Sequence, residues 1–153
     1  MATIKPPKPP QYRPLIETVL RVKDGDTVDL SLDLGFDTWR RQTVRFTGID
    51  TPETTTEAGK AVSWWLKQFL ASVDGIRLMY LDSQSYDKYG GRVLGDIHFF
   101  EPGGPSLVKL MIGGGLGRAY KGTKRLPWTP TDLDAVVKAV STLDPSVLIL
   151  PRK

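Results

Sequence analysis

The chain contains no cysteine and a single histidine, His98, among its 153 residues. The first absence excludes disulfides, zinc ribbons and cysteine nucleophiles, and the second excludes the usual serine–histidine and multi-histidine metal sites. No apolar run approaches the roughly 18 residues needed to span a bilayer. The start, MATIKPPKPP, also lacks the apolar stretch of a signal sequence. We therefore expect a soluble protein without a membrane partner, cytoplasmic as the chain stands, while secretion through a removed leader stays open.

Composition and charge are those of one ordinary globular domain. Hydrophobic residues make up 40% and charged residues 25% of the chain, which suits a single packed core. The 21 lysines and arginines outnumber the 17 aspartates and glutamates, an excess that favours an anionic partner such as nucleic acid. Residues 1–13 hold four prolines and two lysines and predict a flexible, proline-rich arm. We expect a domain over 14–145, a C-terminal tail over 146–153, and a monomer.

The first part of the chain has the patterns of β-strands. Residues 18–22 are rich in strand-forming types, and from 28 to 34 valine and leucine alternate with aspartate and serine, as in a half-buried strand. The tripeptide Gly-Phe-Asp at 35–37 predicts a turn into a third strand over 39–49. Within that strand Arg45 alternates with apolar neighbours, so its side chain should leave the core face.

The second part mixes helix and strand patterns. Between 57 and 72 the apolar residues recur at the i, i+3, i+4, i+7 spacing of an amphipathic helix. Residues 76–81 and 92–100 predict a fourth and a fifth strand. Further helices are expected over 105–112 and after the capping sequence TPTD at 129–132.

These elements follow the order strand, strand, strand, helix, strand, strand, helix, helix, with short connections. Such an order is typical of a small closed barrel that packs helices against its outside. We therefore predict an α+β fold, a five-stranded OB-fold β-barrel with three α-helices packed on it.

Three loops between these elements carry acids and arginines. DGDT at 24–27 fits a hairpin turn by itself. DTPE at 50–53, separated from Arg45 by four residues, fits a strand end followed by a helix start. DKYGGR at 87–92 fits a glycine turn. Each loop alone has this structural explanation, but their conjunction places several acids and two arginines near strand ends, which is far more specific.

In this order, with an amphipathic helix between the second and third, these motifs resemble the staphylococcal nuclease-like (thermonuclease) family over roughly residues 15–143. The resemblance implies a calcium-dependent phosphodiesterase that cuts DNA and RNA, single strands in preference, and leaves 3′-phosphate ends. The competing hypothesis is a noncatalytic OB-fold module that binds nucleic acid or a protein, and the fold alone does not decide between them.

The resemblance also assigns roles to the residues of these loops. It implies that calcium is held by the carboxylates of Asp26 and Asp50 and by the backbone carbonyl of Thr51. It implies that the phosphate is gripped by Arg45 and Arg92. Glu53 is the candidate general base. Two departures from the family pattern are the extra glycine in DKYGGR, which we place in the turn before Arg92, and a short stretch at 54–59.

This chemistry suits a phosphodiester, whose transition state gathers negative charge on its oxygens. A hard dication on oxygen ligands polarises the phosphoryl oxygen and positions water for in-line attack, and guanidinium groups donate paired hydrogen bonds to the equatorial oxygens. Calcium accepts irregular oxygen coordination readily, and magnesium and manganese stay open.

A protein that binds a flexible strand needs aromatic side chains on which the bases stack and basic side chains along the phosphate backbone. The resemblance and the basic stretch after residue 117 give candidate nucleic-acid contacts at Lys88, Tyr89, Tyr120, Lys121, Lys124 and Arg125. For each of these residues a solvated, charged loop is the alternative interpretation.

Overall fold

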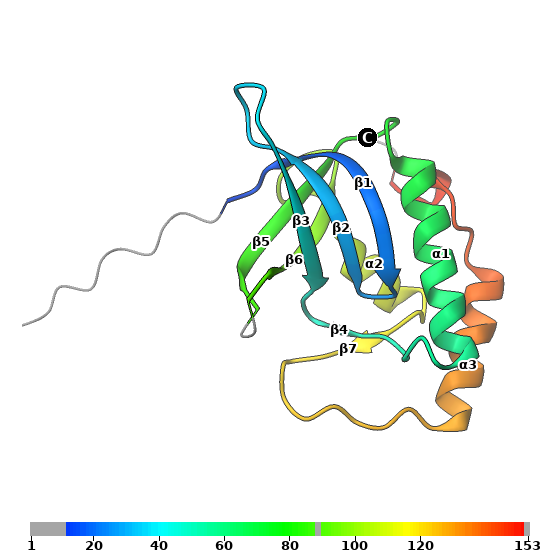
Figure 1. The fold of residues 1–153 in the computed structure, drawn as a ribbon. Helices are drawn as coiled ribbons and strands as arrows, with labels where there is room; N and C mark the ends of the chain where they lie inside the picture. Colours follow the sequence, from blue (N-terminus) through cyan, green and yellow to red (C-terminus); the bar gives the residue numbers. More distant parts are fainter. Residues whose placement is uncertain (1–11, 88–89, 152–153) are drawn as a thin grey trace, which may run out of the picture.

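The computed structural model describes residues 12–87 and 90–151. Five strands close into a barrel in the order β1 (Leu15–Asp24), β2 (Thr27–Asp33), β3 (Trp39–Phe46), β6 (Arg92–Phe99) and β5 (Met79–Tyr86). The pair β3–β6 is parallel and the other pairs are antiparallel. Three helices pack outside this barrel (Figure 1), so the predicted α+β barrel with three helices is confirmed.

The helices begin where their capping residues place them. They are α1 (Glu57–Val73), α2 (Leu107–Gly113) and α3 (Pro130–Thr142). The predicted capping box at the start of α3 is present, because the Thr129 and Asp132 side chains each accept a hydrogen bond from the other residue's backbone N–H. In Figure 1, α1 and α3 lie side by side on one flank of the barrel.

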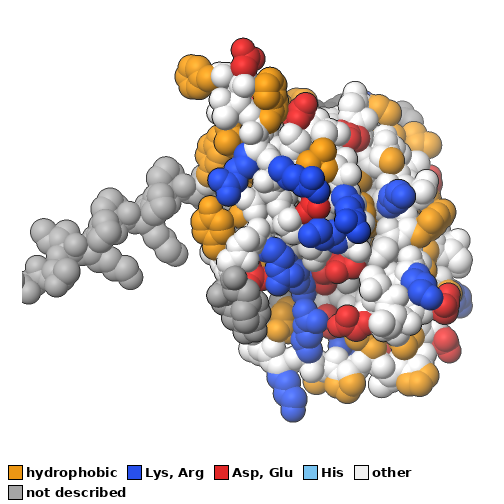
Figure 2. All heavy atoms as spheres, in the orientation of Figure 1, with side chains coloured by type: hydrophobic (Ala, Val, Ile, Leu, Met, Phe, Trp, Pro, Cys, Tyr) orange, Lys and Arg blue, Asp and Glu red, His pale blue; other side chains and the backbone are white. Residues whose placement is uncertain are grey.

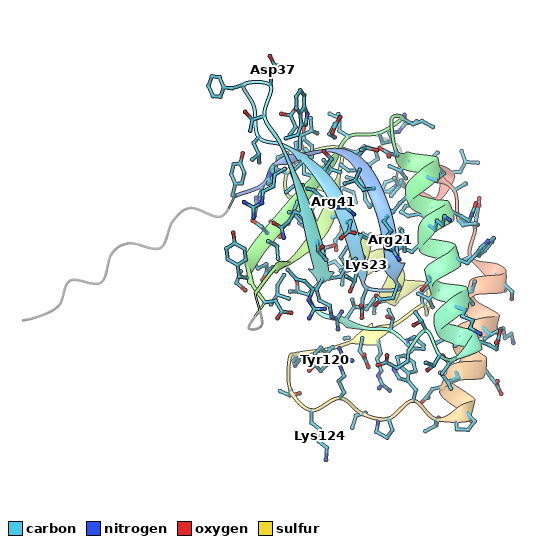
Figure 3. All side chains as sticks on the ribbon, in the orientation of Figure 1. Arg21, Lys23, Asp37, Arg41, Tyr120 and Lys124 are labelled. Carbon is cyan, nitrogen blue, oxygen red and sulfur yellow. The ribbon has the colours of Figure 1, made fainter. Side chains whose placement is uncertain are left out.

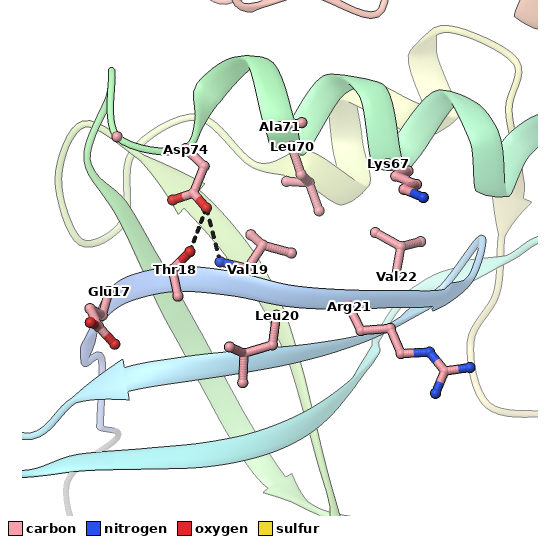
Figure 4. A pocket seen from close by; sticks show the side chains of 11 residues that line it. Glu17, Thr18, Val19, Leu20, Arg21, Val22, Lys67, Leu70, Ala71 and Asp74 are labelled. Carbon is pink, nitrogen blue, oxygen red and sulfur yellow. Dashed lines mark hydrogen bonds between the residues drawn. The ribbon is translucent and has the colours of Figure 1, made fainter.

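The core joins the inward faces of the strands to α1. The ring of Trp65 stacks on Phe69 at 5.0 Å, and Phe69 meets Phe99 of β6 edge-on at 5.8 Å. Trp65 also donates its indole N–H to the Leu143 carbonyl, which ties α1 to the end of α3. Directly after the last residue of α1, Asp74 accepts hydrogen bonds from Thr18 and from the backbone of β1 (Figure 4).

Two of the predicted strands differ from those in the structure. The fourth barrel strand, expected at 76–81, runs from Met79 to Tyr86, because the backbone N–H groups of Ile76 and Arg77 still bond to the carbonyl of Val73 at the end of α1. The expected strand 39–49 is interrupted at Gly48, whose φ is 81°. Beyond that turn a short strand, β4 (Ile49–Asp50), pairs with β7 (Arg118–Ala119).

The two ends of the chain are predicted to be an arm and a tail. Most of the arm, residues 1–11, lies outside the described residues. Beyond 145 the chain forms a 3-10 turn, η1 (Val147–Ile149), and buries Leu150 in the core. Among the described residues, none of the helices has the length and apolar character to span a bilayer.

Candidate functional site

Three loops meet at one end of the barrel. Strand pairing brings them together, since Thr27 is the partner of Arg45 and Thr43 is the partner of Arg92. Together they form a cavity of about 180 Å³, which Arg125 of the loop after β7 also lines. Its lining residues are Asp24, Asp26, Thr27, Arg45, Thr51, Pro52, Glu53, Thr54, Arg92 and Arg125. Five of the six residues that the sequence analysis assigned to catalysis and metal therefore line one cavity.

Two glycines allow these loops to pack closely. A Cβ atom at Gly25 would lie 2.9 Å from the Thr51 hydroxyl oxygen, and one at Gly59 would lie 2.0 Å from the backbone oxygen of Glu53. Contacts this short force a shift, so a larger residue at either position would push the DTPE segment away from the β1–β2 turn or from α1. The glycine of DGDT thus lets Asp26 and Thr51 approach each other.

Asp26 is a buried carboxylate held by one arginine and two hydroxyls. Its Oδ2 lies 2.6 Å from Nη1 of Arg45, and the exposed fraction of each side chain is 12%. The hydroxyls of Thr27 and Thr51 donate to its two oxygens at 3.1 and 3.2 Å. Burial and the neighbouring Asp24 raise the pKa of Asp26 to about 7, against the lowering effect of Arg45. A second cation beside Asp26 would therefore favour its ionised form.

Asp50 is placed differently from the expectation. It is buried, and its Oδ2 accepts hydrogen bonds from Nη2 and Nε of Arg118 at 3.1 and 3.3 Å. Nε of Arg125 lies 3.8 Å from its other oxygen. Asp50 is not among the residues that line the cavity. Its carboxylate is thus neutralised by arginines of the β7 region.

Glu53 reaches the cavity from an exposed position and Arg92 from a half-buried one. The Glu53 side chain is 72% exposed, and its Oε1 lies 3.6 Å from Nη1 of Arg125. Arg92 forms a 2.6 Å ion pair with Asp87. Gly90 and Gly91, with φ of 77° and 78°, lie in the turn before β6, as predicted, so the extra glycine leaves Arg92 at the start of its strand.

The oxygen donors around Asp26 fit a hard dication in part. Asp24, Asp26 and Thr51 line the same cavity, and calcium or magnesium accepts carboxylate, carbonyl and water oxygens together. Within residues 12–87 and 90–151, no three histidine, cysteine, aspartate or glutamate side chains form a group that could hold a metal ion. An ion here would therefore depend on backbone oxygens and water. Asp50 could become a ligand of that ion only if its carboxylate gave up the hydrogen bonds from Arg118.

A larger groove of about 830 Å³ adjoins the cavity and shares Arg45, Arg92 and Arg125 with it. Tyr120 and Lys121, both predicted nucleic-acid contacts, also line this groove. Lysine and arginine side chains form a band across this face of the molecule, from the β2–β3 hairpin to the loop after β7 (Figure 2).

Of the predicted contacts that the structure describes, Lys124 is not among the residues that line the groove. Lys124 lies on the loop after β7 and points away from the barrel (Figure 3). Lys88 and Tyr89 lie outside the described residues.

Sequence reasoning missed the roles of Asp24 and Arg118. Asp24 stands in the quoted DGDT motif but was interpreted only as part of the turn, whereas it lines the cavity and accepts a hydrogen bond from the backbone N–H of Asp26. Arg118 belongs to the basic stretch after residue 117, but its partner, Asp50, is 68 residues away in the sequence. Its guanidinium also lies 4.0 Å above the ring of Trp128.

Comparisons with known proteins add one relative. No family model matches the chain. An uncharacterized protein from Bacillus anthracis is 36% identical over 83 residues, which cover 49% of this chain and 35% of that protein. The match thus spans about a third of the relative's length, and it assigns no activity because the relative is uncharacterized.

Proposed function

We propose that the protein is a metal-dependent phosphodiesterase that hydrolyses single-stranded DNA and RNA, with calcium as the preferred ion. One observation carries the proposal: Asp26 of the β1–β2 turn, Arg45 of β3, Glu53 after β4 and Arg92 of β6 line one small cavity beside a basic groove. Cleavage that leaves 3′-phosphate ends rests on the resemblance to thermonuclease-like proteins alone.

Each side chain has a task in the reaction. Arg45 and Arg92 donate hydrogen bonds to the non-bridging oxygens of the phosphate and stabilise the charge that they gain in the transition state. Glu53 orients a water molecule and accepts its proton while the water oxygen attacks phosphorus and the bond to the 5′ oxygen breaks. The leaving oxygen takes a proton from solvent. A dication held by Asp26, with Asp24 and Thr51 as further oxygen donors, would supply Lewis-acid polarisation of a phosphoryl oxygen.

A second candidate function has an observation in its favour. Asp26 is paired with Arg45, and Asp50 is paired with Arg118, so both carboxylates are neutralised without an ion. This arrangement would suit a noncatalytic module that binds nucleic acid in the adjoining groove. The two functions differ in whether a bound strand is cut.

Incubation of denatured DNA with calcium or with a chelator separates them. The nuclease cuts the DNA with calcium only, and Glu53→Gln protein cuts it far more slowly. A binding module retains the strand in chelator and leaves it intact after calcium is added. Arg77→Ala is a suitable control, because Arg77 is exposed and lies outside the cavity and the groove.

A further inference from the structure

The barrel wall has an opening beside the basic groove. β3 pairs with β6 only from Thr43 onward, so its first residues, 39–42, run past the start of β6 while still paired with β2. A pocket of about 470 Å³ lies there, bounded by β2, β3, β5, β6 and residues 12–14. Its apolar lining consists of Pro14, Leu32, Leu34, Leu81 and Val93. We name it the Tyr86 pocket after the residue on its rim.

Tyr86 connects this pocket to the proposed active site. It lines both the Tyr86 pocket and the groove that contains Arg45 and Arg92, and it is 65% exposed. Tyr12, also on the rim, is 56% exposed. A strand that lay in the groove would therefore meet two accessible aromatic rings as it continued toward the β2–β3 hairpin.

The charge of the pocket suits a nucleotide. Among the described residues that line it, Arg40 alone is charged and none is acidic. The Arg40 guanidinium donates to the side-chain oxygen of Gln42 at 3.2 Å, and Gln42 in turn donates to the carbonyls of Thr43 and Gly91. Arg40 is thus held at the rim by a buried amide. An apolar floor, exposed aromatic rings and one cation match the base and the phosphate of a single strand.

We propose that the Tyr86 pocket binds a base of the single-stranded substrate outside the dinucleotide at the cleavage site. Tyr86 stacks on that base, and Arg40 contacts the neighbouring phosphate. This inference rests on the proposed function, because that function places the substrate strand in the groove from which it runs toward the pocket. It makes the substrate a strand of several nucleotides, because the cavity and the pocket have no lining residue in common and the groove lies between them.

The test compares a thymidine dinucleotide with an octanucleotide, both bound in chelator so that no cleavage occurs. Dissociation constants are measured for the wild type, Tyr86→Ala and Arg40→Ala. Trp64→Ala is the matched control, since Trp64 is 52% exposed on α1 and lies outside the pocket. We expect each pocket variant to bind the octanucleotide about tenfold more weakly, while dinucleotide affinity changes less than about twofold. Trp64→Ala should change neither affinity.

Equal weakening of both ligands, or of neither, would overturn the proposal, as would a wild type that does not bind the octanucleotide. Displacement of the octanucleotide by an oligo-aspartate peptide at equal concentration would assign the pocket to an acidic peptide instead. Cleavage assays with calcium separate this inference from the proposed function. Length-dependent binding without cleavage contradicts only the nuclease, and cleavage without length-dependent binding contradicts only the pocket.

Discussion

The carboxylate of Asp50 and the guanidinium of Arg118 are joined by two hydrogen bonds, at 3.1 and 3.3 Å, across the β4–β7 pair. This contact links the loop that carries Thr51 and Glu53 to the basic segment after β7. It also occupies the carboxylate that a metal ion would share with Asp26. If the proposed enzyme binds calcium, Arg118 would therefore compete with the ion for Asp50.

Replacement of Arg118 by glutamine should expose this competition. In chelator, Arg118→Gln should lower the free energy of unfolding by about 2–3 kcal/mol, because a buried carboxylate loses its main partner. Calcium should then raise the melting temperature more in the variant than in the wild type, since an ion that binds the folded state stabilises it. Thermal unfolding with and without calcium measures both effects. Equal calcium-induced shifts in the two proteins would show that Asp50 is not a ligand.

Glu53→Gln should separate catalysis from stability. The side chain is 72% exposed, so the free energy of unfolding should change by less than about 0.5 kcal/mol. The cleavage rate should fall by about 10²–10⁴-fold, the usual contribution of a general base. Steady-state cleavage of denatured DNA and urea unfolding provide the two measurements. Cleavage by Glu53→Gln at the wild-type rate would show that Glu53 is not the general base.

Gly59→Ala should loosen the DTPE segment from α1. The added Cβ would lie 2.0 Å from the Glu53 carbonyl oxygen, a clash with backbone that cannot relax by a side-chain rotation. We expect a loss of about 2 kcal/mol in unfolding free energy, typical of overpacking, together with slower cleavage. Gly113→Ala is the control, because a Cβ added at Gly113 would meet no described atom within 4 Å outside its own helix backbone and chain neighbours. Similar effects of the two substitutions would mean that close approach at Gly59 is unimportant.

Asp29 should make the stability of the barrel depend on pH. Burial opposes its ionisation, but the Thr43 hydroxyl and the Arg41 and Lys23 cations outweigh burial and hold the pKa of Asp29 below its ordinary value. A lowered folded-state pKa stabilises the protein above the unfolded-state pKa, about 3.9, and this stabilisation is lost as the pH falls through the folded-state value. The stability difference between wild type and Asp29→Asn should therefore be constant from about pH 6 to 8 and shrink in stronger acid.

Urea unfolding near neutral pH and at about pH 3 measures this difference. Because Asp29 lines neither the cavity nor the groove, Asp29→Asn should cleave DNA at the wild-type rate under native conditions. A stability difference between the two proteins that grows as the pH falls would contradict this prediction.

Local sequence patterns predicted the strands and helices of the barrel because each pattern arises from interactions between residues close together in the chain. Alternation in β2, the apolar stripe of α1 and the TPTD capping box depend on residues within a few positions of one another. The start of β5 was missed because hydrogen bonds to the end of α1 extend the turn past Ile76. β7 was missed because two residues have too little pattern to identify a strand.

The candidate site was also predictable only where local motifs identify its residues. The three motifs gave the cavity residues, since loops at one barrel end converge once the strands pair. The partner of Asp50 could not be predicted, because Arg118 reaches it only through the long-range pairing of β4 with β7. Tyr86 was also not identified as a binding residue, since its importance depends on where β3 extends beyond β6.

The most direct test of the account is single-turnover cleavage of a 5′-labelled single-stranded oligonucleotide by wild type, Arg45→Ala and Arg77→Ala, each with calcium and with chelator. The account predicts calcium-dependent cleavage by the wild type and Arg77→Ala, and a rate at least about 100-fold lower for Arg45→Ala, the cost of removing a transition-state donor. Wild-type cleavage that persists in chelator, or that Arg45→Ala matches, would contradict it.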